Sequence, residues 1–280
     1  MCKVLEVSPS GYYGWRSRPL SARAQANAAL LKRVETIFAE SRKTYGSPRV
    51  HAALQRLGMQ VGRQRVARLM RQHGLVAKQR RRRKPVTTER QPGDPVAPNL
   101  LNQDFQADQP NTKGVGDFTY IDTAEGWLYL AVLVDLCTRK VPGWSMAGLC
   151  NNPHHRRAEL VEDAFKMALR RERPAKHLLH HTDQGRQYTA ASYQQQLAPL
   201  QPQFSMSRVG NPYDNAVVES FFATLKSECV THQFATRAEA RTAIFEFIEV
   251  WYNRQRLHSS LGYLSPEAFE RQLLDTICVR

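Results

Sequence analysis

The stretch GNPYDNAVVESFFATLKSE, residues 210–228, decides how the second half of the chain is interpreted. A proline and a cluster of Asn and Asp residues open it, and the apolar spacing after them predicts a helix. Glu219 interrupts the apolar side of that helix, between Val218 and Phe221. Lys226 follows seven residues later, which places it about 20° from Glu219 around the helix and roughly 10 Å along it. One helix face therefore presents a carboxylate and an ammonium together.

The composition indicates a globular chain of 280 residues, of which 42% are hydrophobic. That length suits one large domain or two smaller ones. The longest strongly apolar run, Trp127 to Val134, is far shorter than the roughly 18 residues that a membrane span requires. No signal peptide is recognisable, and the five cysteines form no CxxC pair. We therefore expect a cytoplasmic protein with reduced thiols and no membrane partner.

Positive charge is concentrated in the first third of the chain. The net charge is +15, and residues 1–90 carry 21 Lys and Arg against 4 Asp and Glu. The remaining residues, with 19 basic and 21 acidic side chains, are close to neutral. Neutralisation of phosphates with release of counterions gives such a basic region affinity for nucleic acid. Double-stranded DNA is accordingly the expected partner.

The first 84 residues are predicted to form a small all-α domain. Apolar spacing predicts helices from Ala24 to Glu40, after Ser47 and Pro48, and from Arg63 to His73. Gly58 ends the second helix, and its short connection to the third resembles a helix-turn-helix. The side chains that the third helix would offer to DNA, as a recognition helix does, are Arg63, Arg65, Arg68 and Arg71. An ordinary solvated basic face is the alternative interpretation.

A basic arm and a linker follow this domain. The residues of the arm that suit phosphate contacts are Arg80, Arg81, Arg82, Arg83 and Lys84; a localisation signal has the same composition. Five of the 15 prolines fall between Pro85 and Pro110, among polar residues, so a linker is predicted there. The expected organisation is a basic helical domain at 1–84, a linker at 85–110 and a second domain at 111–275.

The second domain is predicted to be α/β. Its expected strands are 114–123, 127–138, 140–149, 176–183 and 203–208. A helix from about His155 to Arg173 and a long helix that begins at the capping box Thr236 to Glu239 alternate with them.

Three acids stand where this fold could bring them together: Asp117 inside the first strand, Asp183 at the end of strand 176–183, and Glu219. An ionised acid inside an apolar strand costs several kcal/mol unless it is paired or binds a metal. Mg²⁺ prefers carboxylate oxygens, and two such ions about 4 Å apart can activate a nucleophile and stabilise the leaving oxygen at a phosphodiester. A helix-capping role for Glu219 would need its cap at Ala216, and alanine cannot cap.

Other polar residues are weaker candidates. Asp183, taken alone, could simply form a turn before Gly185. Asp135 is a candidate fourth acid, although ending its strand is the simpler interpretation. His180 and His181 have no partner at the spacing of metal ligands, so packing or surface exposure is favoured for them.

The stretches GDFTYI, HHTDQGRQY and SMSRVGNPYDNAVVESFFATLKSE resemble the signature of DDE transposases in the retroviral-integrase superfamily. The resemblance is specifically to the second-frame (OrfB-type) subunit of the IS-three family of bacterial insertion sequences. Thirty-five residues separate Asp183 from Glu219, which is the spacing of that family, and Lys226 stands where the family places a basic residue. TYGSPRVHAAL and WYNRQRLHSSLGYLSPEAFE extend the resemblance over most of the chain.

The resemblance implies an RNase H-like integrase core, a mixed sheet flanked by helices, preceded by the helix-turn-helix-like domain. It implies that Asp117, Asp183 and Glu219 hold two Mg²⁺ ions, which Mn²⁺ can replace, and that Lys226 contacts DNA at the element end. The implied activity is metal-dependent DNA strand cleavage and strand transfer. The implied partners are element-end and target DNA, further copies of the chain on that DNA, and a first-frame subunit or frameshift fusion. The implied place is the bacterial cytoplasm, at the nucleoid.

Two other functions fit the same residues. A non-catalytic DNA-binding regulator would use the basic domain and keep the core as a relic. Gly114, where the family usually has an aromatic residue, and the prolines Pro199 and Pro202 are departures that fit such a decayed copy. A structure-selective nuclease would use the same acids without strand transfer, but the intact Lys226 and the resemblance over the whole chain argue against it.

Overall fold

The computed structural model describes residues 2, 4–78, 96–148, 153–172, 174, 176–189 and 191–278. The chain divides into two compact units, residues 1–78 and 79–280. Each unit has buried apolar residues of its own. Within the described ranges no helix combines the length and the apolar character that crossing a membrane would need.

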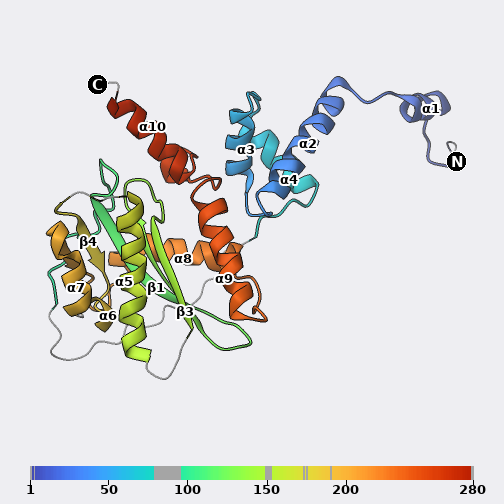
Figure 1. The fold of residues 1–280 in the computed structure, drawn as a ribbon. Helices are drawn as coiled ribbons and strands as arrows, with labels where there is room; N and C mark the ends of the chain where they lie inside the picture. The colour runs from blue at the N-terminus through green and yellow to red at the C-terminus, as the bar shows by residue number, and fades with distance from the viewer. Residues whose placement is uncertain are drawn as a thin grey trace. The chain divides into compact units, whose positions relative to one another are not determined.

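The described part of the first unit is helical throughout (Figure 1). Its elements are α1 (Pro9–Ser17), α2 (Ala22–Glu40), α3 (Ser47–Arg56) and α4 (Arg63–Gln72). After α3 the chain turns at Gly58, whose φ of 76° suits glycine, and the Met59 N–H donates to the Leu54 carbonyl at 3.0 Å. The three predicted helices of the all-α domain are confirmed, and α1 is an element that the apolar spacing did not reveal.

Helices α2, α3 and α4 share a small core. The buried residues of α4 are Val66, Leu69 and Met70, which recur at intervals of three and four and so form one stripe. The corresponding residues of the other two helices are Leu30, Val34, Ile37, Phe38, Val50, Ala52 and Leu54. Because the apolar stripe of α4 packs into this core, the opposite face of the helix is available for its arginines.

The second unit is built on a five-stranded mixed sheet. Its strands are β1 (Lys113–Ile121), β2 (Leu128–Asp135), β3 (Gly143–Gly148), β4 (Leu179–Thr182) and β5 (Gln203–Met206). They lie in the order β3-β2-β1-β4-β5. β1, β2 and β3 are antiparallel neighbours, whereas β4 is parallel to β1 and β5 is parallel to β4. β2 is buried along its whole length, which explains its uninterrupted apolar sequence.

Helices flank this sheet on both faces. The helices of the second unit are α5 (Pro153–Glu172), α6 (Arg186–Thr189), α7 (Ala191–Leu197), α8 (Ala216–Glu228), α9 (Arg237–Phe245) and α10 (Pro266–Cys278), and α9 continues as a π-helix over Glu246–Tyr252. In Figure 1 α5 crosses one face of the sheet and α8 lies behind the other. The predicted mixed sheet flanked by helices is therefore confirmed.

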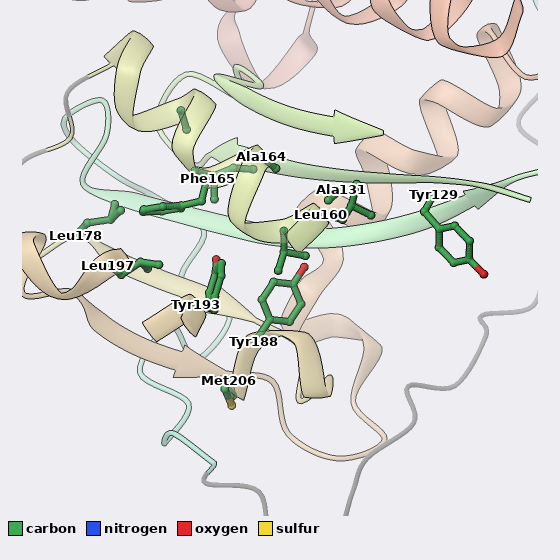
Figure 2. Packing of buried hydrophobic residues seen from close by; sticks show 13 residues of the cluster. Tyr129, Ala131, Leu160, Ala164, Phe165, Leu178, Tyr188, Tyr193, Leu197 and Met206 are labelled. Carbon is green, nitrogen blue, oxygen red and sulfur yellow. The ribbon is translucent and has the colours of Figure 1, made fainter. Parts of the chain in front are cut away.

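A hydrophobic cluster fills the space between the sheet and α5 (Figure 2). β2 contributes alternate residues, Tyr129, Ala131 and Leu133, because side chains alternate between the two faces of a strand. The residues of α5 in the cluster are Leu160, Val161, Ala164, Phe165 and Ala168. The intervening residues of β2, Leu130 and Val132, consequently face the side of the sheet that α8 covers.

Helix α8 packs against β1 and β2 with its apolar stripe. The buried residues of this stripe are Val218, Phe221, Phe222 and Leu225. At the C-terminal end of the helix the nearly buried Glu228 accepts hydrogen bonds from Arg256, the shortest at 2.7 Å, and from the Trp251 indole at 3.1 Å. The C-terminal end of α8 is thus held by a charged pair.

Residues 96–110 belong to the second unit and pack against it. Leu101 is buried, and the hydroxyl of Ser205 on β5 accepts the N–H groups of Leu100 and Leu101 at 2.9 and 3.1 Å. This part of the predicted linker is therefore docked on the sheet. The rest of the predicted linker, 85–95, lies outside the described residues.

Gly143 allows β3 to approach α5 closely. A Cβ atom at this position would overlap the Ala164 carbonyl oxygen and lie 2.7 Å from the Ala168 Cβ. Because the overlapping atom belongs to backbone, it cannot rotate away. We expect Gly143→Ala to lower the free energy of unfolding by about 1–3 kcal/mol, as overpacking does, in urea unfolding followed by circular dichroism.

Gly114→Ala is the matched control for Gly143→Ala. Its new Cβ would meet the Leu133 Cδ1 at 3.4 Å, an ordinary contact with a side chain. We expect the control to lose clearly less stability. Equal stability of the two variants would show that β3 and α5 can separate without cost.

Candidate active site

Asp117 lies on the face of β1 that is turned away from α5. It pairs with Val132 of β2, whereas the cluster under α5 uses Ala131 and Leu133. Side chains of directly paired residues project from the same face. Asp117 therefore lies on the face that α8 covers. Its Oδ1 accepts the N–H of Phe118 at 2.8 Å.

Asp183 directly follows β4, and the register of the sheet places it beside Asp117. The parallel ladder pairs Gly114 with His180 and Val115 with His181. Continued by two residues, this register brings Asp183 opposite Asp117, at the spacing of about 4.8 Å between neighbouring strands. Asp183 Oδ1 also accepts the Gly185 N–H at 3.0 Å. The turn predicted as an alternative role for Asp183 is thus present at the same position.

Glu219 lies in the first turn of α8, the helix that covers this face. The residue before the helix, Asn215, makes no side-chain bond to the helix start. The charge of Glu219 acts on Asp117, as does that of Asp183. The sheet and α8 therefore bring the three acids that the sequence singled out close enough for their charges to interact.

Burial and charge crowding both act on the acids in this seam between β1, β4 and α8. Burial raises the pKa of the Asp117 carboxyl well above its usual value, and the charges of Asp183 and Glu219 raise it further. The Phe118 N–H and the Lys226 ammonium act in the opposite direction. Asp117 is consequently an acid whose ionised form is unfavourable in the metal-free fold.

Lys226 is held over β1 by a hydrogen bond from its Nζ to the hydroxyl of Thr119, at 2.6 Å. Thr119 lies two residues after Asp117, so both side chains project from the same face of the strand. Thr119 is buried. Sequence reasoning did not identify Thr119 as part of the site; the one signal was its place within GDFTYI.

The three acids fit a hard divalent cation in their chemistry. All of the donors are carboxylates, without nitrogen or sulfur ligands, which suits Mg²⁺ or Mn²⁺. A cation would also relieve the repulsion that raises the pKa of Asp117. Among the residues that the structure describes, no three His, Cys, Asp or Glu side chains are already gathered as a metal cluster.

The two histidines before Asp183 serve packing. His180 is 1% exposed, with its Nε2 at 2.6 Å from the Tyr193 hydroxyl, and burial lowers its pKa to about 3. His181 lies on the other face, between the hydroxyls of Ser205 and Ser207 at 2.8 and 3.0 Å. Burial lowers the pKa of His181 to about 4. Both rings are therefore neutral at physiological pH, which agrees with the packing interpretation.

Asp135 ends its strand. Its buried carboxylate accepts the Asn111 N–H at 2.9 Å, the Thr138 N–H at 2.8 Å and the Thr138 hydroxyl at 2.6 Å. These bonds close the turn after β2. These contacts agree with the simpler interpretation of Asp135, that it ends its strand.

The predicted recognition helix, α4, offers fewer arginines than its sequence suggested. Arg63, Arg68 and Arg71 are exposed, but Arg65 is half-buried and its Nε donates to the side-chain oxygen of Asn27 on α2 at 2.8 Å. Arg65 therefore ties α4 to α2. The basic arm, Arg80, Arg81, Arg82, Arg83 and Lys84, lies outside the described residues.

Both units match known protein families. Residues 107–212 and 200–266 match two models described as integrase core domain, and residues 25–83 match an HTH-like domain. The chain is 44% identical to transposase InsF for insertion sequence IS3A of Escherichia coli K12, over 98% of this chain and 94% of that protein. It is also 44% identical to an uncharacterised 31 kDa protein of insertion element IS600 in Shigella sonnei, over 97% of this chain and 98% of that protein.

Among solved structures, the chain is similar to the catalytic core domain of BIV integrase, with 18% identity and a TM-score of 0.43. The similarity covers 59% of this chain and 97% of that chain.

Replacement of Asp117 by Asn removes the crowded charge and keeps the shape of the side chain. Because the folded-state pKa of Asp117 is raised, its contribution to stability is fully present below the unfolded-state pKa of about 4 and is lost as pH rises. We expect Asp117→Asn to raise the melting temperature by a few degrees at about pH 7.5 in EDTA. The difference should shrink as pH falls toward about 4.

Asp122→Asn is the control for this thermal unfolding experiment, since Asp122 is exposed just beyond the end of β1. We expect no comparable gain from it. A variant at Asp117 that melts below the parent at about pH 7.5 would show that its charge is not repelled in the folded state.

Proposed function

The chain belongs to the IS3 family of insertion-sequence transposases, and from that premise we propose how its own residues carry out DNA transposition. In this proposal Asp117, Asp183 and Glu219 hold two divalent cations, Mg²⁺ or in its place Mn²⁺. The observation that carries the proposal is the register of the parallel strands β1 and β4, which sets Asp183 beside Asp117 on the face covered by α8, with Glu219 in the first turn of that helix. The effect of the other two acids on the pKa of Asp117 agrees with this arrangement.

The proposed reaction has two steps. In the first, the oxygen of a water molecule bonds to a phosphorus atom at the element end while the bond to the 3′ oxygen breaks, which frees a 3′-hydroxyl. In the second, that hydroxyl bonds to a phosphorus atom of target DNA while another 3′ oxygen leaves. Bound divalent cations supply activation of the attacking oxygen and stabilisation of the leaving oxygen.

The roles of the remaining residues follow from their chemistry. Lys226 binds a phosphate of the element-end DNA, beside the acids, and Thr119 orients its ammonium. The first unit binds duplex DNA through the exposed arginines of α4, and the basic arm from Arg80 to Lys84 adds phosphate contacts. We place these events on DNA in the bacterial cytoplasm, with further copies of the chain and a first-frame subunit or frameshift fusion as partners.

Strand transfer in Mg²⁺ on a labelled, pre-cleaved element end tests the role of Glu219. Glu219→Gln keeps the length of the side chain but removes the charged ligand. We expect the parent to give joined product. The strand-transfer rate of the variant should be lower by more than about 100-fold, which exceeds the loss caused by replacing a residue that only contacts a metal ligand. Glu159→Gln is the control, because Glu159 is exposed on α5, which covers the other face of the sheet.

Each other outcome of the strand-transfer assay selects a different function. Equal amounts of joined product from the parent and Glu219→Gln would show that Glu219 is not part of the catalytic site. Hydrolysis without joining would favour a nuclease. DNA binding without any product would favour a regulator or decayed copy, and addition of the first-frame subunit would separate these from an enzyme that needs its partner.

Salt dependence of DNA binding tests the recognition helix. We expect Arg68→Ala and Arg71→Ala each to lower the slope of log K against log salt by about 1, because each removes one phosphate contact. Fluorescence anisotropy with a labelled duplex, over a range of salt concentrations, gives this slope.

Arg65→Ala serves as the comparison variant for the salt experiment. Since Arg65 donates to Asn27, its loss should lower the melting temperature of the first unit. Unchanged slopes for Arg68→Ala and Arg71→Ala would mean that α4 presents an ordinary solvated face.

A further inference from the structure

Asp214 is a fully buried carboxylate five residues before Glu219. It lies in the 3₁₀ turn Pro212–Asn215, which leads directly into α8. The residue before the helix, Asn215, supplies no side-chain capping bond. The placement of the first turn of α8 therefore depends on what holds Asp214.

Arg208 binds Asp214 from the loop after β5. Its Nη2 donates to Oδ1 at 2.8 Å and its Nε to Oδ2 at 3.0 Å, so the contact is a two-bond fork. The backbone N–H of Arg208 adds a third bond to Oδ2 at 2.9 Å. The Arg208 guanidinium holds the pKa of Asp214 well below its usual range, so the carboxylate remains charged wherever the protein is folded.

Two amides from a distant part of the chain complete the contacts of Asp214. The side chains of Asn99 and Gln103 each donate to the carboxylate at 2.9 Å, across 115 and 111 residues of sequence. Asn211 donates at 3.1 Å. A carboxylate offers about four lone-pair directions, and the six hydrogen bonds from these donors and Arg208 leave none of them without a partner. Asp214 is thus a junction of segment 99–103, the loop after β5 and the start of α8.

We propose that Asp214 is a positioning residue for Glu219. By joining the start of α8 to β5 and to segment 99–103, it sets where the Glu219 carboxylate stands relative to Asp117. The inference rests on the proposed role of Glu219 as a cation ligand. Replacement of a residue that holds a metal ligand in place, without binding the metal itself, lowers metal affinity or activity by about 10- to 100-fold. A purely structural residue would change stability alone.

The test compares the full-length Asp214→Asn variant with Glu270→Gln. Asn has the same shape, but it loses the charge and turns an NH₂ group toward donors. Glu270 is the control, because it lies on α10 and its carboxylate is paired with the Lys140 ammonium at 2.8 Å, between β2 and β3. Three quantities are measured: amide hydrogen exchange of the peptide over 209–222 in EDTA, the Mg²⁺ concentration that half-saturates thermal stabilisation, and kcat and KM for strand transfer.

We expect Asp214→Asn to accelerate exchange in the first turn of α8 and to raise the half-saturating Mg²⁺ concentration about 10- to 100-fold. The kcat should fall by a similar factor, while KM for element-end DNA stays within about twofold. Glu270→Gln should change none of the three beyond a loss of melting temperature. Parent-like exchange and parent-like Mg²⁺ dependence in Asp214→Asn would overturn the proposal.

A second variant covers the case in which Asp214→Asn does not fold. Asn99→Ala combined with Gln103→Ala removes two donors and keeps the Arg208 fork, so we expect shifts in the same direction but smaller. A double variant with parent-like exchange and Mg²⁺ half-saturation would also overturn the proposal. If the parent itself shows neither Mg²⁺ stabilisation nor joining, the proposed function fails instead, and exchange at α8 in EDTA still decides whether Asp214 positions the helix.

Discussion

Carboxylates hold both ends of α8, the buried Asp214 before its first turn and the nearly buried Glu228 at its last residue. At each end the carboxylate is bound by an arginine, Arg208 or Arg256, and by further donors. At the C-terminal end both side chains of the Arg256–Glu228 pair are nearly buried, and removal of one partner from such a pair leaves an uncompensated charge and costs about 3–5 kcal/mol. The helix between these ends is therefore fixed along β1. The helix has few alternative positions, and its two ends fix where its side chains lie.

The acids along the seam between α8 and the sheet work against the stability of the fold. Asp117 is driven toward its neutral form by burial and by two neighbouring charges. The Lys226 ammonium offsets part of this repulsion, and the buried hydroxyl of Thr119 keeps it over the strand. Strained electrostatics of this kind cluster at functional sites because ligands relieve them. The same crowding that weakens the metal-free fold is what a bound cation would relieve.

The excess basic residues and the three candidate acids lie in different parts of the chain. The excess of positive charge belongs to the first 90 residues, where exposed arginines of α4 stand opposite an apolar stripe. The three acids belong to the second unit, where Asp117 lies on β1, Asp183 directly follows β4 and Glu219 lies on α8. Residues 99–103, which precede that sheet, are bonded to the helix that carries Glu219, by way of Asp214. The segment ahead of the sheet is thus part of the structure around the site.

The sequence by itself determined the kinds of element and singled out the three acids as candidates, because periodicity, capping residues and the spacing from Asp183 to Glu219 are all local or countable. It missed α1, which buries no residue and so has no stripe to recognise. Only the tertiary structure decided which polar residues support others. Arg65 turned out to bind Asn27, and Asp214 to bind Asn99 across 115 residues. Such partners are set by strand register and helix packing, and no pattern within either segment encodes them.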